Sequence, residues 1–363
     1  MIEFKKNWKD TNDRFDSWFH GGKQDRPLLN LWVKRETPFD KLPEEPYSDE
    51  TDMYLNVDKK FAKAYNRFCE REPIAEAFPE FSMNLGAGSL ALYLGCEPKF
   101  TKETVWFLSD NTEYDNFLPL RFDPNNKWFK KHIELVKRQA ELVCGTDIMV
   151  SIPDLIENLD ILASIRGSEN CCYDIYDEPE KMKAALDDIA NVYMDFYDAF
   201  YDIAKTADGR SSFNTFSIQG KGKTAKIQCD FAALMSPSQF DELVLPALKM
   251  QTDQMDNLLF HLDGPECICH VDSLMTLNKL GALQWTPGAR NERGGDERWY
   301  PLYKKVRDAG KGVWIALYEY EPDEAIERAK ALTRYFGKDG LYFLMPTLER
   351  ETAERLMLDL ERL

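Results

Sequence analysis

Hydrophobic and polar positions alternate in two ways along the second part of the chain. Apolar runs of four to seven residues predict buried strands, whereas segments whose apolar residues recur every three to four positions predict amphipathic helices. The predicted strands are 147–152, 212–218, 225–231, 258–262, 283–286, 313–318 and 341–345. The predicted helices are 179–206, 237–257, 265–280, 299–309, 322–336 and 349–363. This alternation is typical of βα units that form a parallel sheet.

The first part of the chain is less regular. Its predicted elements are helices at 4–19, 57–71 and 128–143, an apolar strand at 27–33, a polar stretch at 36–52 and a glycine loop at 84–88. With that strand the count reaches about eight, which favours a closed (β/α)8 barrel over an open doubly wound sheet. We therefore expect an α/β fold of one structural domain. Residues 1–140 would form an N-terminal extension that includes the first barrel strand and the glycine loop, and residues 141–363 the remainder of the barrel.

Charge and composition narrow the possible partners. Lys and Arg number 46 and Asp and Glu 63, so the net charge is −17, which disfavours binding to nucleic acid or to an anionic membrane surface. No apolar run approaches the roughly 20 residues that span a bilayer, and no targeting segment is recognisable. Eight scattered cysteines without a signal peptide indicate reduced thiols, so a cytoplasmic location is predicted. No pattern indicates an oligomeric state.

Polar residues collect where the predicted strands end. In a (β/α)8 barrel the chemistry lies on the loops at the carboxyl ends of the strands. A single polar residue there is often only a helix cap or turn former, so their concentration at one rim is the stronger signal. The candidates for substrate binding and catalysis are Asp154, Arg166, Asp230, His261, Asp263, Trp285, Tyr318 and Glu319.

The loop that begins at His261 carries the densest chemistry. His261 and Asp263 are two residues apart, so both side chains can share one face of a strand end. Histidine there can act as an acid or base or bind a metal, and Glu266 and Cys267 add further donors, so zinc held by these four residues is one interpretation. The alternative is that Pro265 begins a helix in which Cys267 and its neighbours are ordinary helical residues.

Three segments resemble the uroporphyrinogen decarboxylase superfamily. They are Ile-Gln-Cys-Asp at 227–230, Phe-Asp-Glu-Leu-Val-Leu-Pro at 240–246 and Phe-His-Leu-Asp-Gly at 260–264. The resemblance implies a (β/α)8 barrel with its site at the carboxyl mouth. Decarboxylases of this superfamily carry an arginine-containing run, Met-Arg-Gln-Ala-Gly-Arg, which residues 26–35 lack. Its methyltransferases bind zinc through His-x-Cys and a later Cys, whereas here Asp263 replaces that first Cys and 343–346 contain none.

The chain thus resembles a divergent branch related to corrinoid-dependent methyltransferases. The implied function is transfer of a methyl group between a small methylated donor and a corrinoid-binding protein, as in anaerobic metabolism. We expect His261 and Asp263 to activate the leaving atom, with or without zinc, and Asp230 to accept a hydrogen bond from the substrate or from His261. Trp285 and the Tyr318 region would pack on the donor, and Arg166 would pair with a carboxylate or with Asp154. The alternatives are decarboxylation of a tetrapyrrole or other carboxylate, and non-catalytic binding of a corrinoid partner.

Overall fold

A continuous sheet of seven strands forms the regular part of the molecule. The computed structural model describes residues 2–363. The strands follow the order β2-β1-β13-β12-β11-β10-β9, and all neighbours are parallel except β1 and β2. Their bounds are Arg71–Ala75 for β2, Leu28–Lys34 for β1, Leu341–Leu344 for β13, Gly312–Ala316 for β12, Ala282–Thr286 for β11, Asn257–Asp263 for β10 and Thr224–Gln228 for β9. The prediction of a mixed α/β fold with a mostly parallel sheet is confirmed.

The strands opposite this sheet are short. β3 (Glu80–Phe81) pairs in parallel with β6 (Met149–Val150), and β7 (Arg210–Phe213) forms a hairpin with β8 (Ile218–Lys221). A single bridge, Ser151 to Ser212, connects β6 with β7. The strands of residues 2–363 therefore do not join into the predicted closed ring. The β7–β8 hairpin is one reason that the ring stays open. The backbone N–H of Ile152, just after β6, donates to the backbone oxygen of Ser212 in this hairpin at 2.9 Å, and not to a residue of β9.

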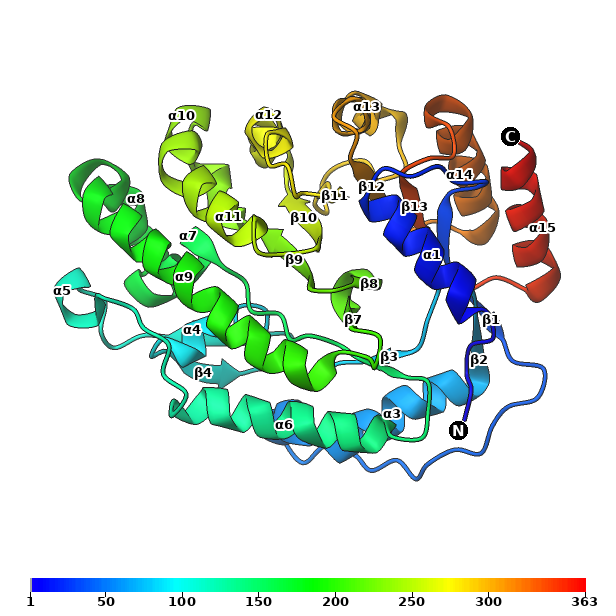
Figure 1. Cartoon of the computed structure of the whole chain (residues 1–363), viewed down its shortest axis with the longest axis horizontal. Coiled ribbons are helices and arrows are strands. Elements are labelled where there is room, and N and C mark those ends of the chain that lie inside the picture. Colours follow the sequence, from blue (N-terminus) through cyan, green and yellow to red (C-terminus); the bar gives the residue numbers. More distant parts are fainter. Residues whose placement is uncertain (1) are drawn as a thin grey trace.

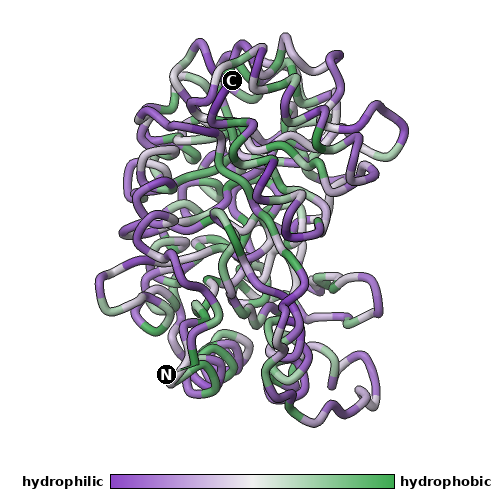
Figure 2. The backbone as a smooth tube through the Cα atoms, turned by 90° about the vertical axis from the view of Figure 1, so that its right-hand side faces the viewer, coloured by the Kyte–Doolittle hydropathy of each residue, from purple (hydrophilic) through white to green (hydrophobic). Residues whose placement is uncertain are grey.

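Helices surround the strands on the outside (Figure 1). Along β10, alternate residues face opposite sides, so Leu258, Phe260 and Leu262 belong to the large core cluster toward the helices, whereas Leu259 faces the interior. Figure 2 shows the same division, with hydrophobic segments through the centre and hydrophilic ones at the periphery. The helices are α1 Trp8–Phe19, α2 Glu50–Leu55, α3 Val57–Glu70, α4 Leu90–Tyr93, α5 Tyr114–Phe117, α6 Lys127–Val143, α7 Asn158–Arg166, α8 Ser168–Asp177, α9 Pro179–Ala204, α10 Pro237–Gln239, α11 Leu245–Thr252, α12 Val271–Met275, α13 Tyr300–Asp308, α14 Pro322–Phe336 and α15 Arg350–Arg362.

Helix α1 packs against the amino ends of the strands. The Trp18 indole donates a hydrogen bond to the backbone oxygen of Gly340, which precedes β13, at 3.1 Å. Its ring lies so close to Gly312, the first residue of β12, that a Cβ there would come within 2.8 Å of it. The Trp18 side chain therefore covers the amino ends of β12 and β13.

The structure differs from the predicted elements in several places. The predicted strand 212–218 is a hairpin of β7 and β8 around the turn Asn214–Phe216, and the predicted helix 237–257 is divided into α10, a π-helical turn and α11, which ends at Thr252. The predicted strand 147–152 is reduced to Met149–Val150, and the predicted helix 265–280 is a 3-10 turn, Pro265–His270, followed by the short α12. The hairpin of β4 (Glu97–Phe100) and β5 (Val105–Leu108) was not predicted. In residues 2–363 no helix is long and apolar enough to cross a bilayer. The division near residue 140 stays a prediction, and buried residues from both sides of it share one core cluster.

Candidate functional site

His261 and Asp263 lie side by side because of the two-residue period of β10. Hydrogen-bonded pairing places His261 opposite Gln228 of β9 and Gln284 of β11, and Asp263 opposite Thr286. The intervening Leu262 is buried against the helices. The sheet register thus presents an imidazole and a carboxylate on one face, at the carboxyl end of a central strand.

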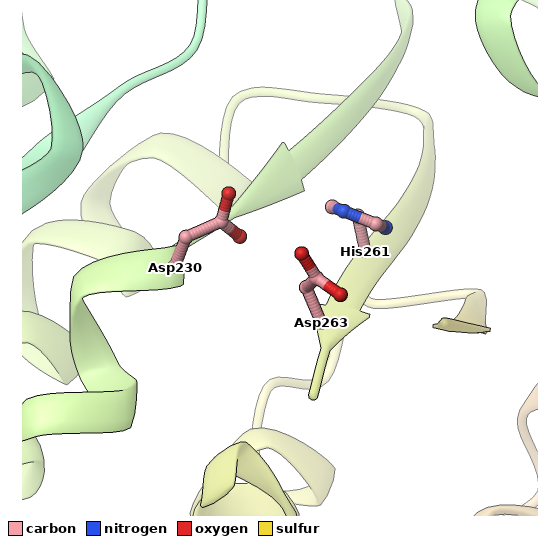
Figure 3. Close-up of side chains that lie close together, drawn as sticks. All are labelled: Asp230, His261 and Asp263. Carbon is pink, nitrogen blue, oxygen red and sulfur yellow. The ribbon is translucent and has the colours of Figure 1, made fainter. Parts of the chain in front are cut away.

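Asp230 completes a group of three side chains. It begins the 3-10 turn Asp230–Leu234 directly after β9, and it faces the two β10 side chains (Figure 3). One potential ligand atom from each of Asp230, His261 and Asp263 lies within 4.8 Å of the other two. This proximity is what a single cation bound by three protein ligands requires.

The turn that carries Asp230 is held in place by Asp160 of α7. The Asp160 carboxylate accepts the backbone N–H groups of Asp230 and Phe231, both at 2.9 Å. The Gln228 side-chain amide donates to Asp160 at 3.1 Å and to Asp230 at 2.8 Å. The Gln228 amide therefore orients the Asp230 carboxylate, and Asp160 anchors the Asp230 backbone. Metal ligands are typically held in this way by neighbouring side chains.

Hydrogen bonding also fixes the orientation of the His261 ring. Its Nδ1 contacts Oε1 of Gln284, whose amide nitrogen donates to the Thr286 hydroxyl at 2.9 Å. With the amide oxygen facing it, Nδ1 carries the proton, and the lone pair of Nε2 remains free to accept a proton or a cation. Burial lowers the pKa of His261, so the imidazole is neutral near pH 7. A neutral imidazole is the form that binds metal.

The surroundings contain more negative than positive groups. Asp230 as a residue is exposed, but its carboxyl group lies in a hollow where desolvation, and then Asp160 and Asp263, raise its pKa to about 7. The one ammonium group that acts on it is Lys226, which pairs with Asp154 at 2.9 Å. Several carboxyl groups therefore share a single nearby cation, and further positive charge would relieve their repulsion.

The segment after β6 supplies residues that sequence reasoning missed. Glu157 is fully buried and accepts the backbone N–H of Gln228 at 2.5 Å, and Asn158 donates to the backbone oxygen of Gln228 at 2.6 Å. Burial raises the pKa of Glu157 to about 8. Ile156 and Asn158 have φ angles of 53° and 47°, a left-handed conformation that is strained for a β-branched residue such as Ile156. In the sequence, the one sign of their role was that Glu157 and Asn158 follow Asp154, a predicted substrate-binding residue, by three and four positions.

The converging ligand atoms are carboxylate oxygens and an imidazole nitrogen, so they suit a cation that accepts oxygen and nitrogen ligands better than a zinc ion held by thiolates. Glu266 is exposed and Cys267 is buried, and neither belongs to the group of converging ligand atoms. Burial and the nearby carboxylates of Asp230 and Asp263 raise the pKa of the Cys267 thiol to about 12. A thiol that keeps its proton is a poor metal ligand. Two carboxylates with one imidazole fit a cation that accepts oxygen and nitrogen donors, such as Zn²⁺, Mn²⁺ or Fe²⁺.

Two of the predicted substrate-binding side chains lie away from this group. Trp285 points to the outer face of the sheet, where its ring packs on Trp299 with 4.9 Å between centroids. The sequence did not reveal this orientation, because a shift of one residue in the register of β11 would have turned Trp285 inward. Arg166 does not pair with Asp154; it forms an ion pair with Asp174 at 2.8 Å and donates to the Thr112 backbone oxygen. Its role here is to join α7 to α8.

Other aromatic and polar side chains occupy the interior and the rim. Trp314 of β12 faces the interior, and its indole donates to the Phe216 backbone oxygen at 2.9 Å. The ring of Phe216 lies 5.3 Å from that of His261. Tyr318 and Glu319 follow β12 in an exposed turn. Among these aromatic contacts, the ring that packs on His261 is that of Phe216.

A hollow opens beside Asp230. It has a volume of about 860 Å³, and Asp160 and Asp230 lie at its inner wall. Three apolar side chains on its lining are strongly exposed: Trp106 at 60%, Leu108 at 52% and Leu234 at 63%. Clustered exposed apolar residues next to a polar group are typical of a ligand or partner surface. The β4–β5 hairpin supplies two of the three, so the unpredicted hairpin forms one side of the mouth.

Comparison with known proteins relates the chain to a solved structure. The structure is similar to a methyltransferase from Methanosarcina mazei, with a TM-score of 0.60 over 97% of this chain and 98% of the other. Identical residues amount to 11%, so the likeness establishes a shared fold. No protein-family description matches the chain by sequence, and no curated protein matches it.

Proposed function

We propose that this protein is a methyltransferase that holds a divalent cation with Asp230, His261 and Asp263 and moves a methyl group between a small methylated donor and a corrinoid carrier protein. The observation that carries the proposal is the convergence of these three ligand atoms within 4.8 Å at the carboxyl ends of the strands. The fold shared with a methyltransferase over nearly the whole chain supports the same reaction class. So does the resemblance of residues 225–290 to the superfamily named above.

When bound, the cation supplies Lewis-acid activation of the oxygen or nitrogen that releases the methyl group. The protein's own residues orient and position the reactants. Gln284 holds the His261 ring, and Gln228 holds the Asp230 carboxyl group. Lys226 forms an ion pair with Asp154. The negative charges of the other carboxyl groups at the site are therefore not fully balanced until a cation binds.

The hollow beside Asp230 is the proposed approach for the donor and the carrier. Its exposed Trp106, Leu108 and Leu234 provide apolar surface, which is where a partner protein gains most binding free energy. The carrier must bring its corrinoid ring close to the methyl donor, and a wide opening permits this. We therefore place the donor between Asp230 and the apolar rim.

Decarboxylation is the second candidate, and it requires cationic groups that hold a substrate carboxylate. The one ammonium group beside Asp230 is Lys226, and Asp154 occupies it at 2.9 Å. The convergence of three potential ligand atoms accords with a reaction that a bound cation assists. The site therefore favours methyl transfer over decarboxylation, and over binding of a corrinoid partner without catalysis.

The test begins with metal content. Protein purified without oxygen is titrated with Zn²⁺, Mn²⁺ and Fe²⁺, and bound metal is measured by elemental analysis after gel filtration. We expect about one equivalent in the wild type and at least a ~10-fold weaker affinity in Asp263→Asn, because a ligand is lost. Glu266→Gln is the matched control, since it removes an exposed acid three residues away, and it should bind as the wild type does.

Activity is then measured with free cob(I)alamin as the methyl acceptor, followed by its absorbance, and a panel of methylated amines, ethers and thioethers as donors. Methyl transfer by the loaded wild type and loss of it in Asp263→Asn would support the proposal. A wild type that binds none of the three metals would overturn the cation site. A loaded protein that captures a corrinoid carrier but transfers no methyl group from any donor would favour the binding role.

A further inference from the structure

A second cavity lies inside the molecule where the sheet does not close. It sits between the edge of the seven-stranded sheet, at β1 and β2, and the β3–β6 pair, and its volume is about 180 Å³. Helix α3, which packs beside α6 (Figure 1), supplies one wall. The lining residues are Trp32, Arg67, Phe68, Arg71, Phe78, Glu80, Asn214 and Ser217. None of them belongs to the Asp230, His261 and Asp263 group.

Glu80 places an unpartnered acid in this cavity. Its side chain is 6% exposed, and neither carboxyl oxygen has a hydrogen-bond partner among the described residues. Burial raises the pKa of Glu80 to about 8, and the side chains of Ser212, Asn214 and Ser217, which lie near the carboxyl group without hydrogen-bonding geometry to it, offset this only in part. At neutral pH the group is therefore a protonated carboxyl with a hydrogen to donate. An unsatisfied buried polar group of this kind is costly unless a ligand or water completes it.

Two arginines at the same cavity are not neutralised by their acidic neighbours. Glu70 pairs with Lys41, and Glu72 pairs with Arg350 at 2.6 Å. Apart from desolvation, the influence that lowers the pKa of Arg67 is the positive charge of Arg71. Both arginines are exposed at the opening of the cavity, so their guanidinium groups are available to pair with an anion that enters it.

We propose that this cavity binds the carboxylate group of a small organic acid. Arg67 and Arg71 would hold the carboxylate from the open side, as guanidinium groups do in paired, parallel hydrogen bonds. Glu80 would donate its proton-bearing oxygen from the closed side. Each group then gains the partner that the protein itself does not provide.

The walls decide for an organic acid over an inorganic anion. Trp32, Phe68 and Phe78 line the cavity, and the Trp32 and Phe68 rings stack with 5.8 Å between centroids. Apolar walls favour carbon atoms attached to the carboxylate, whereas phosphate would need polar partners on every side. The volume is roughly six times the ~30 Å³ that a water molecule occupies, which suits an acid of a few carbon atoms.

The cavity adjoins the proposed methyl-transfer site through one short turn. Asn214 lines the cavity, and Phe216, two residues later in the 3-10 turn Asn214–Phe216, lies against His261. The carboxylate site does not require the cation site, because the two share no side chain. An acid bound there would nevertheless contact the segment that packs on the histidine.

The experiment uses the full chain and propionate as the probe, with inorganic phosphate as the second ligand, and measures binding by calorimetry and by ligand-observed NMR at pH 7. We expect saturable propionate binding in the millimolar range or tighter, with weaker binding of phosphate. Arg67→Gln and Arg71→Gln should each weaken propionate binding at least ~10-fold, because each removes a charge-assisted contact. Lys63→Gln, which removes one charge from the same helix, should leave the affinity unchanged.

Two further variants separate the interpretations. Glu80→Gln keeps a neutral donor of similar shape, so propionate should bind within about threefold of the wild type. Asp263→Asn should also bind propionate normally, even if it loses metal, so a failure of the cation site would not affect this result. The proposal is overturned if folded wild type shows no saturable propionate binding below 20 mM (about 2.3 kcal/mol by the affinity relation), if phosphate binds more tightly, or if both arginine variants bind like the wild type.

Discussion

The two polar regions of the interior are built in different ways. His261 and Asp263 come from a seven-residue strand that is hydrogen-bonded on both sides, so the register with β9 and β11 fixes their direction. Glu80 comes from a two-residue strand, and its surroundings are the β7–β8 hairpin and α3. The seven-stranded sheet is the regular half, and it holds potential metal ligands in fixed directions. The irregular half contains the short pairs β3–β6 and β7–β8, and it leaves side chains such as Glu80 without partners where the strands do not pair.

Asp230 depends on both kinds of support. It follows β9 of the regular sheet, but its turn is held by Asp160 from α7, beyond the short strand β6. The comparison therefore suggests that changes to inward-facing side chains of the regular strands should affect chemistry more than folding, changes to their outward-facing side chains should affect folding alone, and changes in the loop-held half should affect both. Four predictions test this division.

The largest effect is expected at His261. Replacement of its side chain, His261→Ala, should lower turnover by about 10²-fold or more, the usual scale for lost acid–base or metal assistance. Folding should remain nearly intact because the strand register does not depend on this side chain. Methyl-transfer rates and thermal unfolding check this together. A variant that unfolds at a lower temperature while its folded fraction keeps full activity would show that His261 is only structural.

Asp160 should affect folding and activity together. Asp160→Ala removes the acceptor of two backbone N–H groups and of the Gln228 amide, so the free energy of unfolding should fall by about 1–3 kcal/mol. Turnover should fall at least ~10-fold because Asp230 loses its anchored turn. Urea unfolding and steady-state kinetics measure the two effects. Unchanged kinetics in the folded variant would separate Asp160 from the site.

Stability should depend on pH through two buried glutamates, Glu80 and Glu157, which both lie outside the seven-stranded sheet. The folded pKa of Glu80 and of Glu157 is raised to about 8, above the unfolded value near 4.5. Each group is therefore compatible with folding while protonated, and stability is lost as pH rises from about 4.5 through about 8. No charged group acts on Glu80, whereas Lys226 favours ionised Glu157 and Asp154 and Asp160 oppose it.

Replacement by glutamine separates these contributions. Glu80→Gln and Glu157→Gln should each flatten part of this slope, by about 1–3 kcal/mol between pH 5.5 and 8.5. Urea unfolding at pH 5.5, 7 and 8.5 provides the measurement, with the exposed Glu266→Gln as the control. A slope that is the same in the wild type and in both variants would mean that neither carboxyl group is protonated in the folded protein.

The smallest effect on turnover is expected at Trp285. Its ring packs between the sheet and Trp299 on the outer face, so Trp285→Phe should reduce stability by about 1–2 kcal/mol and leave turnover within about twofold. The interior Trp314→Phe is the comparison, since it removes the indole that holds Phe216 against His261. If Trp285→Phe lowered turnover more than Trp314→Phe, the assignment of Trp285 to a packing role and of Trp314 to the support of His261 would be incorrect.

The sequence by itself determined the elements with strong periodicity and the residues that share a strand face. Helix 322–336 has the predicted bounds, and β10, β11 and β12 lie within two residues of theirs. His261 and Asp263 lie on one face because the strand period is two. The proximity of Asp230 was expected because parallel strands bring their carboxyl ends to one edge.

Only the tertiary structure decided the environment of each group. The inward positions of Gln284 and Trp314 and the outward position of Trp285 depend on strand register, which is set by hydrogen bonds between segments far apart in the chain. Burial within the folded chain raises the pKa values of Glu80 and Glu157, whereas Ser212 and Lys226, each more than 60 positions away in sequence, lower them in part. Periodicity reports which side of an element is apolar, whereas contacts across the fold determine what each polar side chain meets.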